Sequence, residues 1–199
     1  MRIALADDAW LDVERGWIGA AQAERLLGRV RAEAVWEQRE IVLFGKRILQ
    51  PRLIAWGGDL PYRYSGQTLE ARPLTPAVAD LLDRVRAFAA VPFNHVLVNR
   101  YRDGRDSMGM HADAEPELGP APVVATVSLG ATRRFTMVPR RARDGERRSL
   151  ELGPGSLLVM GGAGFQRGFR HGLPRDPKVE GERISLTFRM VAPGLFARV

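Results

Sequence analysis

The sequence predicts a mainly β fold with flanking helices (α+β), built on two packed antiparallel sheets of the jelly-roll kind. After Pro92 the chain alternates short apolar runs with turns rich in Gly, Pro and Asp, a pattern typical of strands in such sheets. Before Pro92, two segments carry apolar residues at helical spacing, so we expect helices on the outer face of one sheet. The chain has 199 residues, 45% of them apolar, which indicates one domain over residues 1–199.

Composition narrows the classes of site and partner. Cysteine is absent, which excludes disulfides and thiolate metal sites, so any metal must be held by nitrogen and oxygen ligands. The formal net charge of +7 indicates a polyanionic partner, although arginine-rich composition also has other origins. Neither a secretory signal nor a membrane-spanning run is recognisable, so we expect a cytoplasmic protein without membrane association. We also expect a monomer.

The first half of the chain is expected to form a helix, a hairpin and a second helix. Residues 20–36 have the apolar spacing of an amphipathic helix. The apolar runs 41–43 and 53–56, with a turn at Phe44-Gly45-Lys46 after the first, predict a hairpin with Phe44 near its tip. The second helix begins at Pro76 after the cap residue Thr75, and its predicted buried stripe is Val78, Leu81, Leu82, Val85 and Phe88.

The second half is expected to be rich in strands. Each predicted strand is short and is bounded by turn residues. The strands are predicted at His95–Tyr101, Gly109–Asp113, Val123–Leu129, Arg134–Val138, Leu150–Leu152, Ser156–Met160, Phe169–His171 and Arg183–Val191. Between two of them, residues 139–149 carry five arginines, which indicates either a solvated loop or a loop that contacts phosphate.

A metal site is predicted from three residues of this half. In an extended strand alternate side chains share a face, so His111 and Asp113 can point into one cavity, and His171 is the natural third ligand. Two imidazoles and one carboxylate, with the remaining positions open, suit iron(II) that must also bind oxygen and an organic cosubstrate. The alternative is that the His-x-Asp tripeptide arises by chance.

The last predicted strand offers a site for a dicarboxylate. Arg183, Ser185, Thr187 and Arg189 share one face, while the apolar residues between them share the other. Two guanidiniums leaning together could bracket a molecule with a carboxylate at each end, such as a five-carbon diacid. The alternative is that both arginines lie on a surface edge strand. Two further residues that share a strand face, Asn99 and Tyr101, could donate hydrogen bonds to the same molecule.

Several motifs in sequence order resemble the AlkB-type iron(II)- and 2-oxoglutarate-dependent nucleic-acid dealkylases. The resemblance runs from about residue 41 to residue 191. The motifs are Pro51-Arg52 with Gly58-Asp59, Tyr62-x-Tyr64-Ser65-Gly66, Asn99-Arg100-Tyr101-x-Asp103-Gly104, His111-x-Asp113, Met160 with Gln166-x-x-Phe169-x-His171, and Arg183 to Arg189.

The resemblance implies a fold and a set of cofactor ligands. It implies a double-stranded β-helix (jelly roll) over about residues 93–191 as the catalytic core, with an N-terminal nucleotide-recognition lid over about residues 41–70. His111, Asp113 and His171 would bind Fe(II), which also takes O2. The cosubstrate 2-oxoglutarate would be held by Asn99, Tyr101, Arg183, Ser185 and Arg189.

The resemblance also implies substrate contacts. Tyr62 and Tyr64 match positions that contact or stack on a flipped base, although from the residues alone they could equally pack in the core. Phe44 matches a hairpin residue that members active on duplex DNA insert into the base stack; the alternative is a core residue. The remaining expected contacts are Arg52, Ser65 and Glu115.

Three departures from the family pattern put substrate preference in doubt. Ala114 replaces an acid that is common in relatives, which leaves Glu115 as the acidic contact to the base edge. Met110 stands where polar residues are common, and Phe169 stands where tryptophan is frequent.

The implied function is oxidative demethylation of N-alkylated bases of the 1-methyladenine and 3-methylcytosine type in DNA. This is direct-reversal repair, which releases formaldehyde, succinate and carbon dioxide. The partner would be single- or double-stranded alkylated DNA, and possible partners include RNA. Two competing functions stay open: an oxygenase of the same fold acting on RNA, protein or lipid, and a non-catalytic jelly-roll binding protein.

Overall fold

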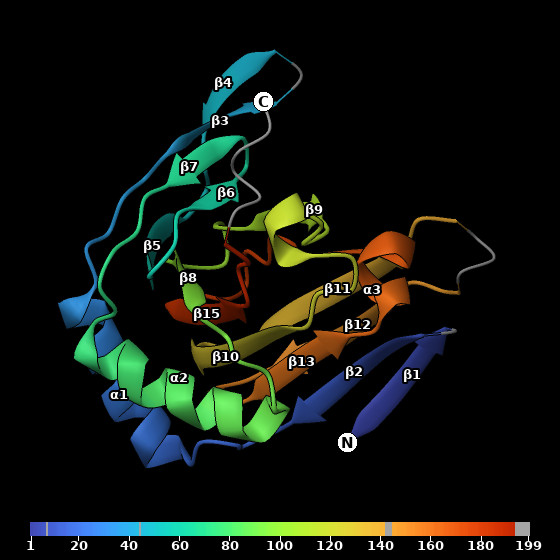
Figure 1. Cartoon of the computed structure of the whole chain (residues 1–199). Coiled ribbons are helices and arrows are strands. Elements are labelled where there is room, and N and C mark those ends of the chain that lie inside the picture. The colour runs from blue at the N-terminus through green and yellow to red at the C-terminus, as the bar shows by residue number, and fades with distance from the viewer. Residues whose placement is uncertain (7, 44, 142–144, 194–199) are drawn as a thin grey trace.

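The computed structural model describes residues 1–6, 8–43, 45–141 and 145–193, and it confirms a jelly-roll-like architecture of two facing antiparallel sheets (Figure 1). The larger sheet has the strand order β1-β2-β13-β10-β15-β8-β5, and the smaller has the order β12-β11-β14-β9. All neighbouring strands within both sheets run antiparallel. The predicted metal and cosubstrate residues lie between these two sheets.

The strand bounds follow the predicted pattern closely. The larger sheet contains β1 (Arg2–Ala6), β2 (Ala9–Glu14), β13 (Leu157–Gly161), β10 (Val124–Gly130), β15 (Arg183–Arg189), β8 (His95–Tyr101) and β5 (Leu53–Gly58). The smaller sheet contains β12 (Arg148–Leu152), β11 (Arg133–Pro139), β14 (Phe169–Leu173) and β9 (Met108–His111). Each strand predicted from residue 95 onward is present, with ends that differ by no more than about two residues, as is usual for strand boundaries.

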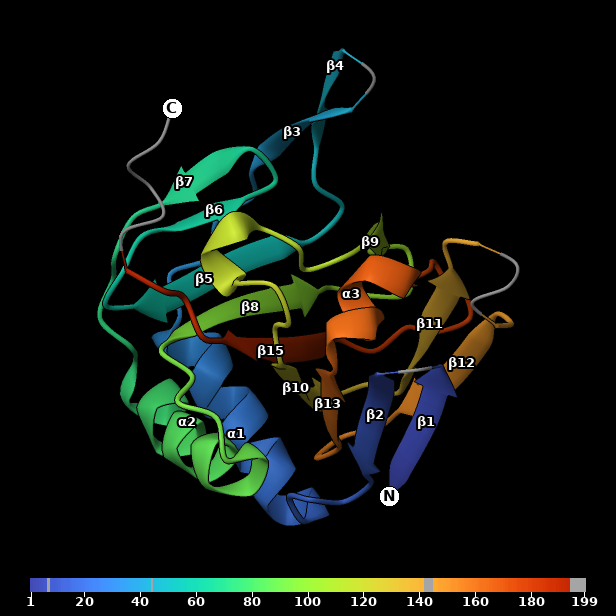
Figure 2. The ribbon, with the colours of Figure 1, turned by 45° about the vertical axis from the view of Figure 1, so that its right-hand side comes forward.

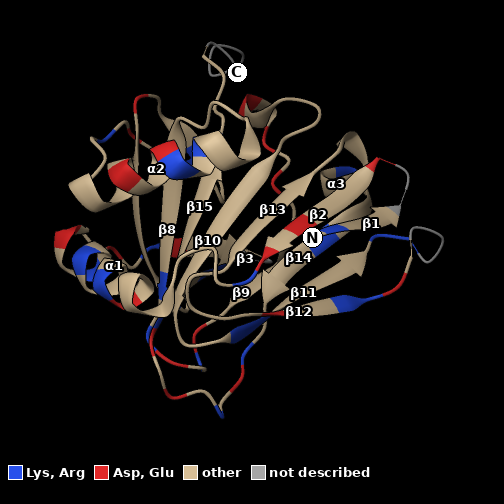
Figure 3. Cartoon of the chain, turned by 90° about the horizontal axis from the view of Figure 1, so that it is seen from below, with Lys and Arg blue, Asp and Glu red and all other residues tan. Residues whose placement is uncertain are grey.

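Helices α1 (Ala20–Glu33) and α2 (Pro76–Ala89) cover the outer face of the larger sheet (Figure 2). The apolar side of β15, made by Ile184, Leu186 and Phe188, packs into the core cluster that these helices cover. Charged residues of α1 and α2 stand out against the mostly uncharged strands of the sheet (Figure 3). Strand β15 therefore turns its apolar side to the helices and its polar side to the space between the sheets.

The helices differ from prediction in detail. Helix α1 ends three residues before the predicted Trp36. Thr75 stands at the N-cap of α2, but its side chain makes no cap hydrogen bond. Phe88, predicted in the buried stripe, is 42% exposed, whereas Ala77 in the first turn, which was not predicted in that stripe, is buried. The reason is that Phe88 lies in the last turn, where its ring meets Trp17 edge-on at the margin of the helix layer.

Two hairpins stand outside the main sheets, and one was predicted with the wrong return strand. In the first, β3 (Glu40–Leu43) pairs with β4 (Lys46–Leu49), whereas the predicted return strand, residues 53–56, belongs to β5 in the larger sheet. Side chains along β4 are exposed, so its apolar pattern gave no strand signal. Phe44 lies outside the described residues. In the second hairpin, β6 (Tyr62–Tyr64) pairs with β7 (Gln67–Leu69).

The N-terminal strands were not predicted. Strand β2 buries alternate residues Ala9, Leu11 and Val13 and pairs with β13, so it extends the larger sheet. Polar residues around Asp12 obscured that alternation in the sequence. Two short helical segments, η1 (Pro116–Leu118) and α3 (Ala163–Gly168), were also missed. Within the described ranges, no helix has the length and apolar character needed to span a membrane.

Candidate metal and cosubstrate site

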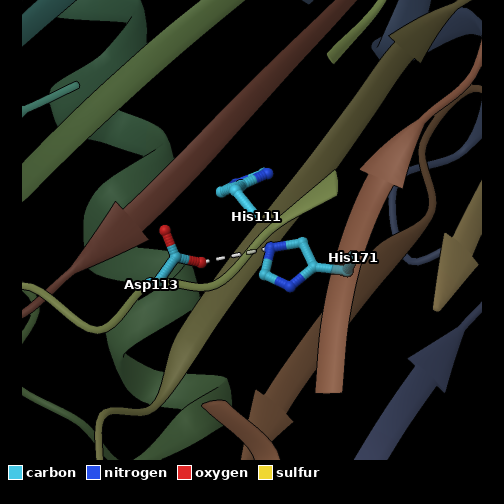
Figure 4. A group of neighbouring side chains, drawn as sticks. All are labelled: His111, Asp113 and His171. Atoms are coloured by element: carbon cyan, nitrogen blue, oxygen red, sulfur yellow. Dashed lines mark ion pairs between the residues drawn. The ribbon is translucent and has the colours of Figure 1, made fainter. Parts of the chain in front are cut away.

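The three predicted metal ligands come together between the sheets. His111 ends β9 and pairs in register with His171 of β14, and the two imidazole rings have centroids 4.4 Å apart. Asp113 lies two residues past the end of β9 rather than in the predicted strand. One ligand atom from each of the three residues lies within 4.8 Å of the others (Figure 4). The arrangement therefore unites the three side chains, but the carboxylate reaches the cluster from a loop.

The protonation state of His111 leaves one of its nitrogens free to bind a metal cation. His111 Nδ1 lies 3.0 Å from the carbonyl oxygen of Gly109, which leaves Nε2 with a lone pair for a metal. Burial, reinforced by His171, lowers the pKa of His111 to about 4, so this imidazole is neutral near pH 7. His171 Nε2 stands 3.3 Å from Asp113 Oδ2, an oxygen without a hydrogen-bond partner among the described residues. Two imidazole nitrogens and this unpartnered, buried carboxylate oxygen form a ligand set that suits iron(II).

Asp113 is held in its charged form by a buried arginine. Arg189 donates two hydrogen bonds to Asp113 Oδ1, at 3.1 Å from Nε and 2.6 Å from Nη2. Burial alone would raise the pKa of the Asp113 carboxyl, but Arg189 and the two imidazoles outweigh it and hold that pKa well below its usual value. The backbone amide of Asp113 donates to Oε1 of Gln166 at 2.9 Å. The carboxylate is thus oriented from both sides.

The predicted cosubstrate residues line a cavity beside the metal ligands. Arg183, Ser185, Thr187 and Arg189 of β15 all line it. On the neighbouring strand, the other two predicted residues, Asn99 and Tyr101, stand opposite Ser185 and Arg183 in register and also line the cavity. A cavity with two arginines and several hydrogen-bonding side chains on one wall has the charge and the donors for a small dicarboxylate.

Both arginines keep donors free for a ligand. Arg183 donates from Nη2 to Ser128 Oγ at 2.8 Å, and its Nε has no partner among the described residues. Burial lowers the pKa of Arg183 to about 10. Within the same described ranges, Arg189 likewise has an unpartnered Nη1. Unpaired buried donors are costly, so they indicate a ligand that accepts from them.

Arg52 is placed differently from the expected substrate contact. It is only 4% exposed, and it donates from Nε to Asn99 Oδ1 at 2.8 Å and from Nη2 to the Tyr64 hydroxyl at 2.5 Å. A third hydrogen bond goes to the carbonyl oxygen of Ser107. Arg52 therefore orients the Asn99 amide, whose nitrogen is left to donate, and acts on any ligand through its neighbours.

The other predicted base contacts lie around the β6–β7 hairpin. The Tyr62 ring is fully buried and packs against His95 with centroids 4.9 Å apart, while Tyr64 is 6% exposed. Ser65 is exposed at the turn, in a left-handed conformation with φ of 49°. Burial and the nearby Asp113 raise the pKa of Glu115, which is half-buried. The structure thus places Tyr62 and Tyr64 inside the protein rather than on an open stacking surface.

Sequence reasoning missed several residues of the site. Gln166 was part of a recognised motif, but its hydrogen bond to the Asp113 backbone was not foreseen. Arg133 and His95, which lie outside the cavity lining, are both 1% exposed; His95 began a predicted strand, but nothing in the sequence marked either side chain as buried. The cavity is also lined by Met108 and Phe135, which come from strands of the smaller sheet. Only the closure of one sheet over the other identifies these residues.

Comparisons with known proteins agree with this geometry. The model of the 2OG-Fe(II) oxygenase superfamily matches residues 11–189. Rat alpha-ketoglutarate-dependent dioxygenase alkB homolog 3 is 38% identical over 186 residues, which cover 89% of this chain and 63% of the relative. Mouse DNA oxidative demethylase ALKBH2 is 36% identical over 186 residues, which cover 88% of this chain and 77% of the relative.

A solved structure supports the fold. The structure of OsALKBH1 superposes with a TM-score of 0.62 over 96% of this chain and 100% of that one, at 16% sequence identity. The chain spans less than two thirds of the length of the alkB homolog 3 relatives, 63% for rat and 65% for mouse. The family match over residues 11–189, together with the identity to ALKBH2 over 77% of its length, identifies the chain as a member of the 2OG-Fe(II) oxygenase superfamily that belongs to its AlkB-type dealkylases.

Proposed function

We propose that this protein is an Fe(II)- and 2-oxoglutarate-dependent dioxygenase that removes methyl groups from N-alkylated bases in DNA. The lesions would be of the 1-methyladenine and 3-methylcytosine type, and the products formaldehyde, succinate and carbon dioxide. The observation that carries the proposal is the cluster of His111, Asp113 and His171 in the wall of a cavity that also contains two buried arginines. Both parts are needed, because the oxidation requires a metal and a dicarboxylate together.

Each group of residues has a defined task in this proposal. When bound, iron(II) with 2-oxoglutarate and O2 supplies the oxidising chemistry. His111, Asp113 and His171 would hold the metal, and Arg189 keeps Asp113 ionised for that purpose. Arg183 would bind the distal carboxylate of 2-oxoglutarate, with hydrogen bonds from the other polar residues of the same wall (Asn99, Tyr101 and Ser185).

The substrate must be a nucleotide turned out of its stack. A methyl group on a ring nitrogen at the pairing edge is unreachable inside a duplex, so the base has to be flipped, and weak pairing of a damaged base lowers that cost. Glu115 and Tyr62 are the proposed contacts to the base edge. Because Tyr62 is fully buried, the base can reach it only if the β6–β7 hairpin moves outward. We infer that this hairpin opens when the substrate enters.

One observation favours DNA, and a second favours nucleic acid of either kind over protein. The relative that this chain matches over 77% of its length is a DNA oxidative demethylase. The net charge of +7 suits a polyanion, whose binding releases counterions. An oxygenase acting on RNA or protein, and a binder without catalysis, are the competing functions that the experiment below distinguishes. The monomeric state and the cytoplasmic location stay predictions, which gel filtration and cell fractionation would test.

The decisive experiment is mass spectrometry of methylated oligonucleotides. Single-stranded DNA, duplex DNA and RNA carrying 1-methyladenine are incubated with the protein, iron(II), ascorbate and 2-oxoglutarate. We expect loss of one methyl group from DNA with release of formaldehyde. The matched control is His111→Ala, because the hydrogen bond of that imidazole is to Gly109 within its own strand. Demethylation of RNA alone would transfer the proposal to RNA, and iron binding without any demethylation would refute it.

A further inference from the structure

Arg133, at the start of β11, is a fully buried cation whose contacts are backbone carbonyls. Its side chain is 1% exposed, and among the described residues no carboxylate lies within ion-pair distance of it, so Asp103, Asp106 and Asp176 act on its charge only from further away. Nη1 donates to the carbonyl oxygen of Asp103 at 3.0 Å, and Nη2 donates to those of Asp106 at 2.9 Å and Pro174 at 2.8 Å. These carbonyls occupy the two terminal nitrogens, while Nε has no partner among the described residues and no carboxylate pairs directly with the guanidinium, which is unusual for a buried group.

The carbonyls come from the two loops that frame the cosubstrate cavity. Asp103 and Asp106 follow directly on β8, which ends at Tyr101. Pro174 begins the loop that leads from β14 to Arg183 at the start of β15. The same two loops are joined through Gly104, whose amide donates to the carbonyl oxygen of Val179 at 2.7 Å. One guanidinium therefore fixes the ends of both strands that carry cosubstrate residues.

A second buried cation without a direct carboxylate partner lies close by. The guanidinium carbons of Arg133 and Arg183 lie 5.8 Å and 5.5 Å from the centre of the Tyr101 ring. Arg183 is 2% exposed and, within the described residues, also lacks a carboxylate partner. Repulsion from Arg133 adds to burial in lowering the pKa of Arg183. This end of the cavity thus concentrates two buried positive charges, and bound anionic charge would offset both.

We infer that Arg133 is a positioning residue for the cosubstrate: it fixes the ends of the cavity strands and adds buried positive charge where the distal carboxylate of the dicarboxylate binds. The inference rests on the proposed placement of 2-oxoglutarate against Arg183. Arg133 is not among the residues that line the cavity, and its two terminal nitrogens are occupied by carbonyls. It acts through Tyr101 and Arg183, and through the field of its own charge.

The test compares two ligands that differ only at the distal end. Binding of 2-oxoglutarate and of 2-oxobutyrate, which lacks the distal carboxylate, is measured by calorimetry on protein loaded with manganese(II). For Arg133→Met we expect about tenfold weaker binding of 2-oxoglutarate, as for one charge interaction across a partly polar interior, and little change for 2-oxobutyrate. The matched control is Arg134→Met, whose side chain is 49% exposed, and it should leave both affinities unchanged.

Further variants separate the possible failures. Arg133→Lys keeps the charge but loses the forked geometry, so it should melt at a lower temperature yet retain the preference for 2-oxoglutarate. If Arg133→Met does not fold, Arg133→Gln replaces it, because it removes the charge and keeps a donor for the carbonyls: a selective loss of 2-oxoglutarate affinity supports the inference, and unchanged affinity overturns it. Equal losses for both ligands in Arg133→Met would also overturn it. If Arg183→Met leaves 2-oxoglutarate binding intact, the proposed placement of the cosubstrate fails instead.

Discussion

Replacing Asp113 by alanine should remove two properties at once, iron binding and a large part of the stability. Asp113 is 2% exposed and is the carboxylate that contacts Arg189, which is itself 3% exposed. Breaking a buried pair by removing one partner costs roughly 3 to 5 kcal/mol, because the other charge stays buried without compensation. For a chain of this size, that loss lowers the melting temperature by roughly 6 to 20 °C.

A double variant separates stability from metal binding. If the cost comes from the uncompensated Arg189, then Asp113→Ala combined with Arg189→Met should recover most of the lost stability, since both charges are gone. All of these variants should fail to bind iron(II). Melting is followed by calorimetry without metal, and iron binding by equilibrium dialysis.

An exposed pair of the same length serves as the control. Arg2 Nη2 and Asp12 Oδ2 are also 2.6 Å apart, but the Arg2 side chain is 62% exposed. Asp12→Ala should therefore cost no more than about 1 kcal/mol. The decrease in melting temperature of the double variant is compared with the sum of the decreases for Asp113→Ala and Arg189→Met alone. If the two are equal, the role of the uncompensated Arg189 is refuted. Equal melting temperatures for Asp113→Ala and Asp12→Ala would refute it as well.

Three further residues can be tested one at a time. Arg183→Ala should weaken 2-oxoglutarate binding by roughly 2 to 5 kcal/mol, measured by titration, and unchanged affinity would place that arginine outside the cosubstrate site. Burial, with Arg189, lowers the pKa of His95 from 6.5 to about 3. Between these pH values the unfolded chain binds a proton that the folded chain lacks. The contribution of His95 to the free energy of unfolding is therefore fully present above about pH 6.5 and declines below it, by roughly 2 kcal/mol at about pH 5. His95→Phe should lose no hydrogen bond and should flatten this decline in acid melting curves, and a variant with the wild-type slope would contradict the assignment. If Phe44 enters the gap left by a flipped base, Phe44→Ala should lower the repair of methylated duplex DNA by about tenfold or more and leave the repair of single strands unchanged. Equal losses of activity on both substrates, together with a lowered melting temperature, would indicate a core residue.

The strands from residue 95 onward, the metal ligands and the polar face of β15 could all be predicted from the sequence alone. Alternation of polar and apolar residues is a local property, so Arg183 to Arg189 could be assigned to two faces without any knowledge of the partner strands. His111, Asp113 and His171 were found because their spacing forms part of motifs in a fixed order. The jelly-roll class followed from the number of short strands and their turns.

The partners of the buried charged side chains, by contrast, are decided by the tertiary structure. Arg52 looked like a substrate contact, but the fold brings it against Asn99 and Tyr64, forty-seven and twelve residues away in the chain. Arg133 had no motif at all, and its role depends on two loops that meet only when the sheets close. Long-range pairing of this kind is invisible to periodicity, because a guanidinium at a given position can face carbonyls, a carboxylate or water with the same local pattern. The choice among them is made by which strands become neighbours.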